Sequence, residues 1–420
     1  MLLLIKNAKI IYPGHELHNS KKDILIKNGV IEKIGPRISD NAAKQISSKS
    51  LHLSPGWFDI GSIVGEPGFE QRETLETLSR TAASGGYVAV AIFPNTEPVV
   101  DNRSAVQYIL NQSTNSAVDL HPIAAISKNC NGEEITEMID LSRSGAVAFS
   151  DGHHAITSSA LMMRALDYSK SVNGLIIHRP VDPSLANESL VNEGKVSIEL
   201  GMKGNPNLAE VVALNRDIQL QKYTGAKVLL HNLSAKESVE TLKSLKQNNL
   251  FSSVSYLNLC KTEEAVYGYD TNYKTLPSLR SEEDRQALIS GVNKKTIQVI
   301  SSNHVALEED EKKKEYIYAA PGATGLQTSF AAINTYAEGI KLNNLINCIA
   351  INPRKILDLP AVDLEKGAKA ELTLFDPTLE WSLNSKTNTS KSKNSPFWDK
   401  SLKGGVIGIV NGKKSHFNKY

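Results

Sequence analysis

The spacing of hydrophobic residues changes twice along the chain. The first part has short, β-branched segments separated by turns, such as the Asn28-Gly29 turn between two apolar stretches. The middle part alternates apolar strands with amphipathic helices, and the last part returns to short β-like segments. We therefore expect a small β-domain built from both ends of the chain, residues 1–53 and 360–420, beside a central domain of residues 54–359.

The central domain has the pattern of a parallel barrel. We expect eight strands, which end near the following residues: Ile60, Phe93, Ala125, Ser150, His178, His231, Leu257 and Ser302. Helical stretches such as residues 75–84 and 208–224 lie between these strands. Eight strand-helix units in about 250 residues favour a (β/α)8 barrel with parallel strands and right-handed crossovers. A doubly wound open sheet is the alternative architecture.

The composition limits the kind of protein. A chain of 420 residues with 40% hydrophobic and 22% charged residues is typical of a soluble globular protein with two domains. The net charge of +2 gives no general attraction to nucleic acid or to an acidic membrane surface. No apolar run reaches the roughly 20 residues that a membrane helix needs. The three cysteines lie far apart with no CxxC pair, which indicates a reducing cytoplasm and no disulfide framework.

Polar residues at the expected strand ends are the first candidates for a functional site, because the active sites of such barrels form there. The candidates are Asn95 after strand 2, Asp151 after strand 4, His178 after strand 5, His231 after strand 6, and Asn303 and His304 after strand 8. Two imidazoles and one carboxylate are chemically adequate zinc ligands. A histidine at a strand end is also often a hydrogen-bonded structural residue, so both interpretations stay open for His178 and His231.

A set of motifs resembles the dihydroorotases of the amidohydrolase superfamily over roughly residues 55–400. The motifs are PGWFDI at 55–60, EPGFE at 66–70, AASGG at 82–86, PNTEP at 94–98, FSD at 149–151, DPSL at 182–185, NEG at 192–194, TGA at 224–226, HNLS at 231–234, NYK at 272–274, LR at 279–280, GLQT at 325–328 and SPF at 395–397. The resemblance implies a hydrolase barrel with a small β-sandwich made from both termini, acting in pyrimidine biosynthesis. Working members interconvert carbamoyl-aspartate and dihydroorotate with one or two zinc ions, while a carboxylate after strand 8 moves the proton.

The metal-binding positions of the family are partly replaced in this chain. The first strand of the family ends in His-x-His, where this chain has Gly61 and Ile63, and neither residue can coordinate a metal. The aspartate after strand 8, which is a ligand and the general base, is Asn303 here, and an amide cannot take up a proton at neutral pH. The retained metal-binding positions are Asp151, His178 and His231.

The substrate-binding positions show similar losses. The arginine that holds the substrate carboxylate is replaced by Gly65, which removes a bidentate contact. The substrate-contacting asparagine and histidine are replaced by Leu276 and Leu307, and the glutamate of the Gly-Leu-Glu-Thr motif is Gln327. Asn95 is retained.

These losses favour a catalytically inactive homologue, because they are concentrated at functional positions while the barrel motifs stay legible. The resemblance implies a structural or regulatory role, with aspartate carbamoyltransferase as protein partner, since noncatalytic homologues of this kind assemble with that enzyme and support its oligomer. We expect a homo-oligomer that holds no cofactor or a weakly bound single zinc ion.

Two other functions remain open at this stage. The first is an active cyclic amide hydrolase with displaced ligands, His153, His154 or His304, and the second is a small-molecule sensor that keeps the barrel pocket. Residues 384–395 are rich in serine, asparagine, threonine and lysine. This composition predicts a surface loop in preference to a basic docking patch.

Overall fold

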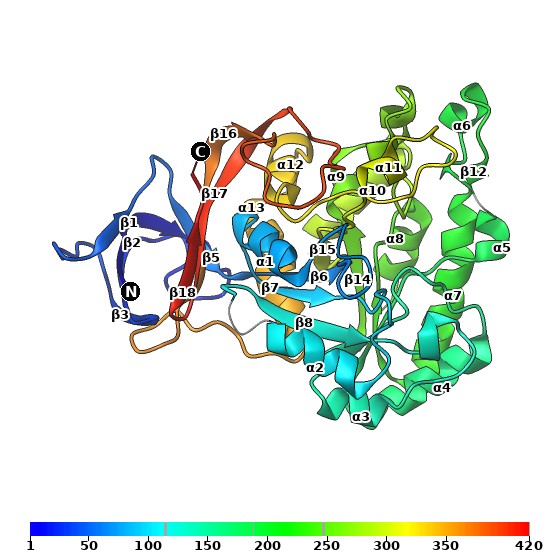
Figure 1. The fold of residues 1–420 in the computed structure, drawn as a ribbon, viewed down its shortest axis with the longest axis horizontal. Helices are drawn as coiled ribbons and strands as arrows, with labels where there is room; N and C mark the ends of the chain where they lie inside the picture. The colour runs from blue at the N-terminus through cyan, green and yellow to red at the C-terminus, as the bar shows by residue number, and fades with distance from the viewer. Residues whose placement is uncertain (113–115, 188, 246–247, 420) are drawn as a thin grey trace.

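The protein, described here by a computed structural model of residues 1–112, 116–187, 189–245 and 248–419, has a broad and a narrow part (Figure 1). The broad part contains eight parallel strands in the order β6-β7-β8-β9-β10-β13-β14-β15. Their bounds are β6 (Trp57–Ser62), β7 (Tyr87–Ile92), β8 (Asp119–Ala124), β9 (Ala148–Phe149), β10 (Leu175–His178), β13 (Lys227–Leu230), β14 (Leu250–Ser255) and β15 (Val299–Ser301). Each strand ends within two residues of its predicted end.

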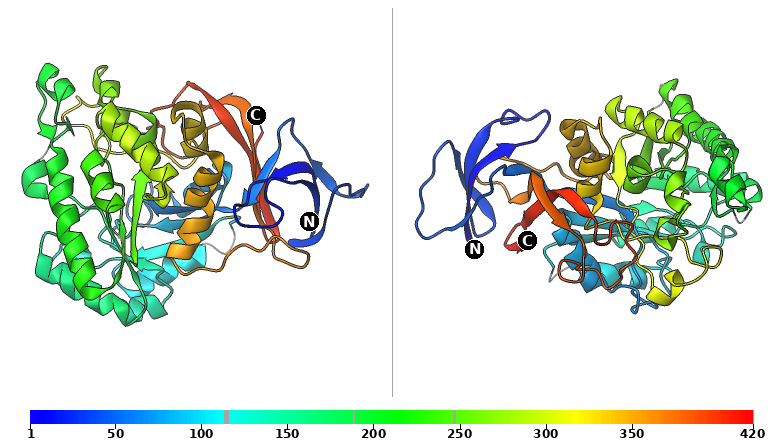
Figure 2. Two further views of the ribbon diagram at one scale, coloured as in Figure 1. Left: turned by 180° about the vertical axis from the view of Figure 1, so that it is seen from behind. Right: turned by 90° about the horizontal axis from the view of Figure 1, so that it is seen from above.

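The helices lie on the outside of this parallel sheet (Figures 1 and 2). In the sequence, helices lie between successive strands of the sheet. The α-helices are α1 (Leu75–Ser84), α2 (Arg103–Gln112), α3 (Met138–Arg143), α4 (Ser159–Lys170), α5 (Pro183–Ala186), α6 (Lys195–Glu199), α7 (Asn207–Thr224), α8 (Lys236–Lys243), α9 (Tyr256–Cys260), α10 (Glu282–Asn293), α11 (Glu309–Lys312), α12 (Ser329–Tyr336), α13 (Leu342–Ile346) and α14 (Asn352–Ile356). Short elements are η2 (Lys128–Cys130), η3 (Glu263–Val266), η4 (Thr271–Tyr273), η5 (Asn347–Ile351), β11 (Val191–Asn192) and β12 (Gly204–Asn205). Among the described residues, no helix is long and apolar enough to cross a membrane.

The seam between the first and the last strand nearly closes the barrel. The Asp59 carboxylate on β6 accepts hydrogen bonds from the backbone N–H of Ser302, at 2.6 Å, and from its hydroxyl, at 2.7 Å. The Ile63 N–H donates to the His304 carbonyl at 2.9 Å, and Ile63 pairs with Val305 in parallel. These contacts join two strands that an open sheet would leave at opposite edges. The predicted (β/α)8 barrel is therefore confirmed, and the alternative of a doubly wound sheet is wrong.

The narrow part is a second sheet built from both ends of the chain. Its strand order is β18-β17-β16-β5-β1-β2-β3, and β4 pairs with β1. The bounds are β1 (Leu2–Ile10), β2 (Lys21–Lys27), β3 (Val30–Gly35), β4 (Lys44–Ile46), β5 (His52–Pro55), β16 (Glu371–Ser382), β17 (Ser401–Asn411) and β18 (Lys414–Phe417). The two ends meet where β5 runs antiparallel to β16, with Leu372 opposite Pro55. The exact domain boundaries at residues 53 and 360 stay a prediction.

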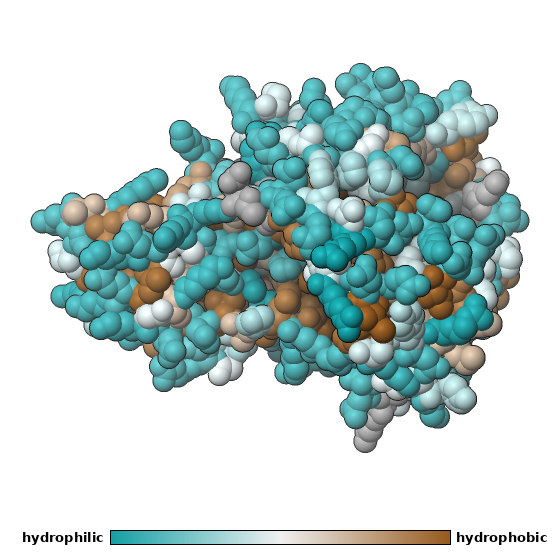
Figure 3. All heavy atoms as spheres, turned by 60° about the horizontal axis from the view of Figure 1, so that its bottom comes forward, coloured by the Kyte–Doolittle hydropathy of each residue, from teal (hydrophilic) through white to brown (hydrophobic). Residues whose placement is uncertain are grey.

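Strand β16 has one face on the barrel and the other on the core of the terminal sheet. Phe375 packs against Trp57 and Phe330 of the barrel, with ring centroids 5.5 Å and 5.1 Å apart. The neighbouring Leu374 faces the opposite way, into a core shared with Ile10 on β1. Because successive side chains of a strand point to opposite faces, one strand ties both parts together. The face drawn in Figure 3 is mostly hydrophilic, with hydrophobic residues in several separate places on both parts.

The segment between β16 and β17 contains the predicted surface loop, residues 384–395, which we call the strap. The strap is less exposed than its composition predicts, because it lies along the barrel rim. Ser392 is buried and its hydroxyl donates to the Arg72 carbonyl at 2.9 Å. Asn394 is buried too, and its amide donates to the Val305 carbonyl at 2.9 Å. Polar side chains of the strap thus satisfy backbone groups of the barrel, which composition alone cannot reveal.

Candidate functional site

Gly61 lies in the barrel directly against His231. Its φ of +94° is in the left-handed region that favours glycine. A Cβ atom added at this position would lie 2.7 Å from Phe93 Cε2 and 2.8 Å from His231 Nε2. The space that the family's first histidine needs is therefore already filled by two rings.

His231 presents a neutral, covered imidazole to this part of the barrel. The Ser253 hydroxyl accepts the Asn232 N–H at 2.8 Å and forms a hydrogen bond with His231 Nδ1 at 3.0 Å. The other ring nitrogen, Nε2, is buried and has no hydrogen-bond partner among the described residues. Burial, followed by the charges of His153 and Arg179, lowers the pKa of His231 to about 3. The neutral ring is thus covered on its Nε2 side, where the Gly61 backbone approaches it.

His178 faces the outer helix layer. Its Nδ1 lies 2.6 Å from Asp217 Oδ2 on α7, and its Nε2 accepts the Ile156 N–H at 3.3 Å. Burial on its own would raise the pKa of Asp217, but the neighbouring His178 and Arg216 hold this pKa below its ordinary value. Both ring nitrogens of His178 therefore have protein partners.

Asp151 and Asn95 are both engaged in holding loops together. The Asp151 carboxylate accepts the N–H groups of Ile126 and Ser127, at 2.8 Å and 2.9 Å, and the Ser127 hydroxyl at 2.5 Å. The Asn95 amide donates to the Asp151 carbonyl at 3.1 Å and accepts the His153 N–H at 3.4 Å. Asn95, the retained substrate-binding position, thus holds the loop that contains Asp151 and His153.

The three retained metal-binding positions are not assembled into one ligand set. Asp151 faces the loop after β8, His178 faces α7, and His231 faces Gly61. Within the part of the chain that the structure describes, no group of three histidine, cysteine, aspartate or glutamate side chains is placed to hold a metal ion. As these side chains lie, the donor set does not fit a zinc ion, and the weak single-zinc site on Asp151, His178 and His231 stays a prediction.

Asn303, at the family's general-base position, belongs to a directed hydrogen-bond chain. The Ser301 hydroxyl donates to Asn232 Oδ1 at 2.6 Å, and Asn232 Nδ2 donates to Asn303 Oδ1 at 3.0 Å. Asn303 Nδ2 then donates to the Leu276 carbonyl at 3.0 Å. The Leu276 carbonyl can only accept a hydrogen bond, so residue 303 must supply a donor. An amide has such a donor, and a carboxylate lacks one. The asparagine is therefore suited to its structural role and not to proton transfer.

The substrate-binding positions are filled as well. A Cβ atom added at Gly65 would lie 2.0 Å from the Phe69 carbonyl oxygen and 2.9 Å from that of Glu73. An arginine has no space there while this turn keeps its shape. Leu307 is buried, and its N–H donates to Asn394 Oδ1 of the strap at 3.3 Å.

The histidines considered as displaced ligands do not form a site either. His304 is fully buried, its Nε2 lies 2.5 Å from Glu73 Oε2, and its Nδ1 accepts the Gly325 N–H at 3.1 Å. Both nitrogens of His304 are thus engaged. His153 is half-buried and His154 is exposed, and neither joins a ligand group among the described residues.

Arg179 is the residue of this region that the sequence analysis missed. Its Nη2 donates to the His153 carbonyl at 3.1 Å, and its covered Nε has no partner. The positive charge of Arg179 helps to lower the pKa of His231, while burial lowers the pKa of Arg179 itself to about 10. A signal was present, because a basic residue directly after a strand end must face opposite to its neighbour His178. A fixed cation near His231 opposes the binding of a metal cation.

Comparison with known sequences identifies the family. Residues 52–238 match the family model described as dihydro-orotase-like. A dihydroorotase of Syntrophotalea carbinolica is 36% identical, over 98% of this chain and 98% of its own length. A dihydroorotase of a Thermoanaerobacter species is 38% identical, over 97% and 95% of the two chains. The chain belongs to the dihydroorotase family.

Solved structures share the architecture of this dihydroorotase family member. The L-hydantoinase (dihydropyrimidinase) of Arthrobacter aurescens has a TM-score of 0.84 at 20% sequence identity, covering 100% of this chain and 97% of its own. The D-hydantoinase of a Thermus species has a TM-score of 0.80 at 17% identity, with the same coverage. At such identities the likeness shows the fold alone, which is the barrel and terminal sheet described above.

The buried ring of His231 in this dihydroorotase family member should stay neutral down to about pH 3. In the unfolded chain a histidine has a pKa of about 6.5, so between these values the unfolded state binds the extra proton. His231 therefore lowers the free energy of unfolding as the pH falls from about 6.5 towards 3. Histidine NMR spectra should show constant His231 signals from pH 8 to 5, with the urea-unfolded chain as control. A midpoint near 6.5 in the folded protein would contradict this environment.

Proposed function

We propose that this dihydroorotase family member is a noncatalytic protein of pyrimidine biosynthesis that works without zinc and supports the assembly of aspartate carbamoyltransferase. The packing of His231 and Phe93 against Gly61 carries the proposal. The neutral ring of His231 occupies the place of a metal ligand. Its Nε2, which has no hydrogen-bond partner, is covered by other atoms. The site therefore lacks both a ligand and the space for one.

The other changes support inactivity independently of the metal. Asn303 cannot act as a general base, and loss of such a base alone lowers a rate by about 10²- to 10⁴-fold. Gly65 has no space for the arginine that would bind the substrate carboxylate. Because residues of one site act as a unit, these losses need not multiply. Each of them is nevertheless sufficient to make turnover slow.

The proposed partner follows from the resemblance to noncatalytic homologues, and the surface offers a place for it. Ile198, Tyr269 and Tyr318 are large apolar side chains that are 81%, 51% and 69% exposed. The elements that carry Ile198 and Tyr269 are joined by the Tyr267 hydroxyl, which donates to Glu199 Oε2 at 2.5 Å. Helix α6, which carries Ile198, lies at the edge of the barrel (Figure 1). The exposed side chains of Ile198 and Tyr269, on two elements joined by this hydrogen bond, are the contact surface that we propose.

Sedimentation of the full-length protein with the aspartate carbamoyltransferase of the same organism tests this function. We expect a complex heavier than either protein alone, and Ile198→Asp should weaken it about tenfold, because a charge would be buried in an apolar contact. Tyr223→Asp, at a 78% exposed position at the end of α7, is the matched control. Two independently sedimenting proteins at micromolar concentrations would contradict the proposed partner.

A further inference from the structure

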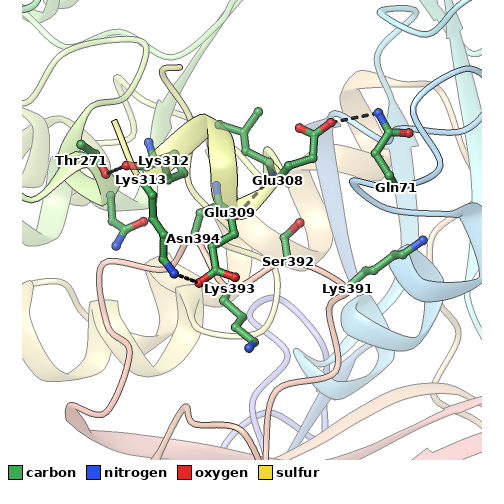
Figure 4. A pocket seen from close by; sticks show the side chains of 12 residues that line it. Gln71, Thr271, Glu308, Glu309, Lys312, Lys313, Lys391, Ser392, Lys393 and Asn394 are labelled. Atoms are coloured by element: carbon green, nitrogen blue, oxygen red, sulfur yellow. Dashed lines mark hydrogen bonds and ion pairs between the residues drawn. The ribbon is translucent and has the colours of Figure 1, made fainter. Parts of the chain in front are cut away.

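A cavity of about 450 Å³ lies at the barrel rim between the strap and α11 (Figure 4). It lies outside the family's metal positions, and Leu307 forms part of its wall. Its charged lining residues are Lys312, Lys313, Lys391, Lys393, Glu308 and Glu309. Lysines therefore outnumber glutamates two to one in the lining.

The two glutamates of this cavity are already neutralised by other side chains. Glu308 accepts hydrogen bonds from Gln71 Nε2 at 2.9 Å and from Arg72 Nε at 2.8 Å. Glu309 forms an ion pair with Lys313 at 2.5 Å. Figure 4 shows the contacts of Glu308 with Gln71 and of Glu309 with Lys313. The negative charges of the lining are thus directed at protein groups and leave the lysine charge in excess.

Part of this excess charge is buried. Lys312 is 7% exposed, and its ammonium donates to the carbonyls of Ala320 and Gly322 at 2.9 Å and 3.0 Å. Lys274 is equally buried and donates to the Tyr316 carbonyl at 2.9 Å. Among the described residues, neither lysine forms an ion pair with a carboxylate. Burial, followed by the charge of Lys274, lowers the pKa of Lys312 to about 7. Asp270 acts in the opposite direction, so Lys312 is partly protonated at neutral pH, and an anion beside this wall would stabilise its charged form.

The strap supplies exposed positive charge at the edge of the same cavity. Lys391 and Lys393 are exposed and alternate with Ser392 and Asn394, which are buried and fix the strap to the barrel. Lys391 donates to a backbone carbonyl at 2.7 Å. The Lys393 ammonium forms no hydrogen bond or ion pair with any residue that the structure describes. The strap thus holds the Lys393 ammonium at the cavity, where its charge also helps to lower the pKa of Glu309.

We propose that this cavity binds the phosphate group of a small phosphorylated metabolite. Lysine ammonium groups bind phosphate as point charges, whereas carboxylates are matched better by the fork of an arginine. The described lining residues include four lysines and no arginine. The volume of about 450 Å³ is within the range of small-molecule sites. This ligand site goes beyond the proposed assembly role and does not depend on it.

Calorimetric titration of the full-length protein with ribose 5-phosphate tests the proposal, with ribose and succinate as matched probes. We expect saturable binding of ribose 5-phosphate with a Kd below about 1 mM. Ribose, which lacks the phosphate, should give no saturable heat. Succinate, which carries two carboxylates, should bind at least about tenfold more weakly because it cannot use the lysines as well.

Three variants locate the site. Lys393→Ala should weaken the binding of ribose 5-phosphate about three- to tenfold, because it removes an exposed ammonium whose interaction within the protein is the electrostatic one with Glu309. Lys386→Ala removes an exposed lysine of the same strap that does not line the cavity, and should change the Kd less than about twofold. Lys312→Met should weaken binding more than Lys393→Ala does. Since Lys312 also ties down residues 320 and 322, circular dichroism must show that this variant is folded.

The same titrations can overturn the proposal. Absence of saturable binding up to about 10 mM ribose 5-phosphate would show that the cavity is not a phosphate site. An equal effect of Lys386→Ala and Lys393→Ala would show diffuse attraction to the strap instead of a defined site. If succinate bound as tightly as ribose 5-phosphate, the cavity would be a carboxylate site and not a phosphate site. None of these outcomes bears on the association with aspartate carbamoyltransferase, which the sedimentation experiment tests separately.

Discussion

Glu73→Ala should lower the free energy of unfolding by about 3–5 kcal/mol, because it breaks a fully buried pair and leaves its partner uncompensated. Glu73 Oε2 lies 2.5 Å from His304 Nε2, and its Oε1 accepts the Ser390 hydroxyl at 2.7 Å. One carboxylate thus connects the end of the last strand to the strap. Loss of this carboxylate should both destabilise the barrel seam and release the strap.

Urea unfolding measures the first effect, and limited proteolysis within residues 384–395 measures the second. Glu76→Ala is the matched control, because this glutamate lies three residues away at an exposed position of α1. We expect the control to change the unfolding free energy by less than about 0.5 kcal/mol. A Glu73→Ala protein as stable and as protease-resistant as the control would show that the buried pair does not hold the strap.

Restoring the family's ligands by Gly61→His, Ile63→His and Asn303→Asp together should destabilise the protein without restoring a zinc site. The sequence alone predicts that metal binding returns before turnover does. The structure changes this expectation, because a side chain at Gly61 meets Phe93 and His231 and needs a left-handed backbone. Overpacking and this backbone conformation together cost about 2–4 kcal/mol. The carboxylate of Asn303→Asp would in addition face the Leu276 carbonyl.

The single variant Ile63→His adds an imidazole without the crowding and the left-handed backbone of Gly61. Ile63 is half-buried, and its backbone has no left-handed conformation. We expect Ile63→His to be clearly more stable than Gly61→His in thermal unfolding. Zinc content after dialysis should stay substoichiometric in all three single variants and in the triple variant. A triple variant that holds one zinc per chain at the stability of the unmodified protein would show that the site is not closed by packing.

The sequence allowed the fold to be predicted because the fold depends on periodicity. Strand and helix alternate with regular apolar spacing over the central domain, so each strand end could be placed within two residues. The turn at Asn28-Gly29 likewise marks the hairpin of β2 and β3. These patterns average over many residues, and an error at one residue does not change the architecture.

The site was less predictable because it depends on the direction of single side chains. His178 and Asp151 stand where the family has metal ligands, yet their side chains turn to α7 and to the loop after β8. The place of Arg179 directly after the strand end was the one sequence signal for the cation that lies near His231. The burial of Asn394 within a strongly polar strap escaped prediction for the same reason, since its partners are distant in sequence.

The most direct test of the account is the zinc content of the purified, zinc-saturated and dialysed protein, measured beside its hydrolysis of dihydroorotate. The account predicts substoichiometric zinc and no hydrolysis above a protein-free control, because His231 is covered, His178 and Asp151 face other partners, and Asn303 is no base. One zinc ion per chain together with turnover of about 1 s⁻¹ or faster, in protein free of any other dihydroorotase, would contradict it.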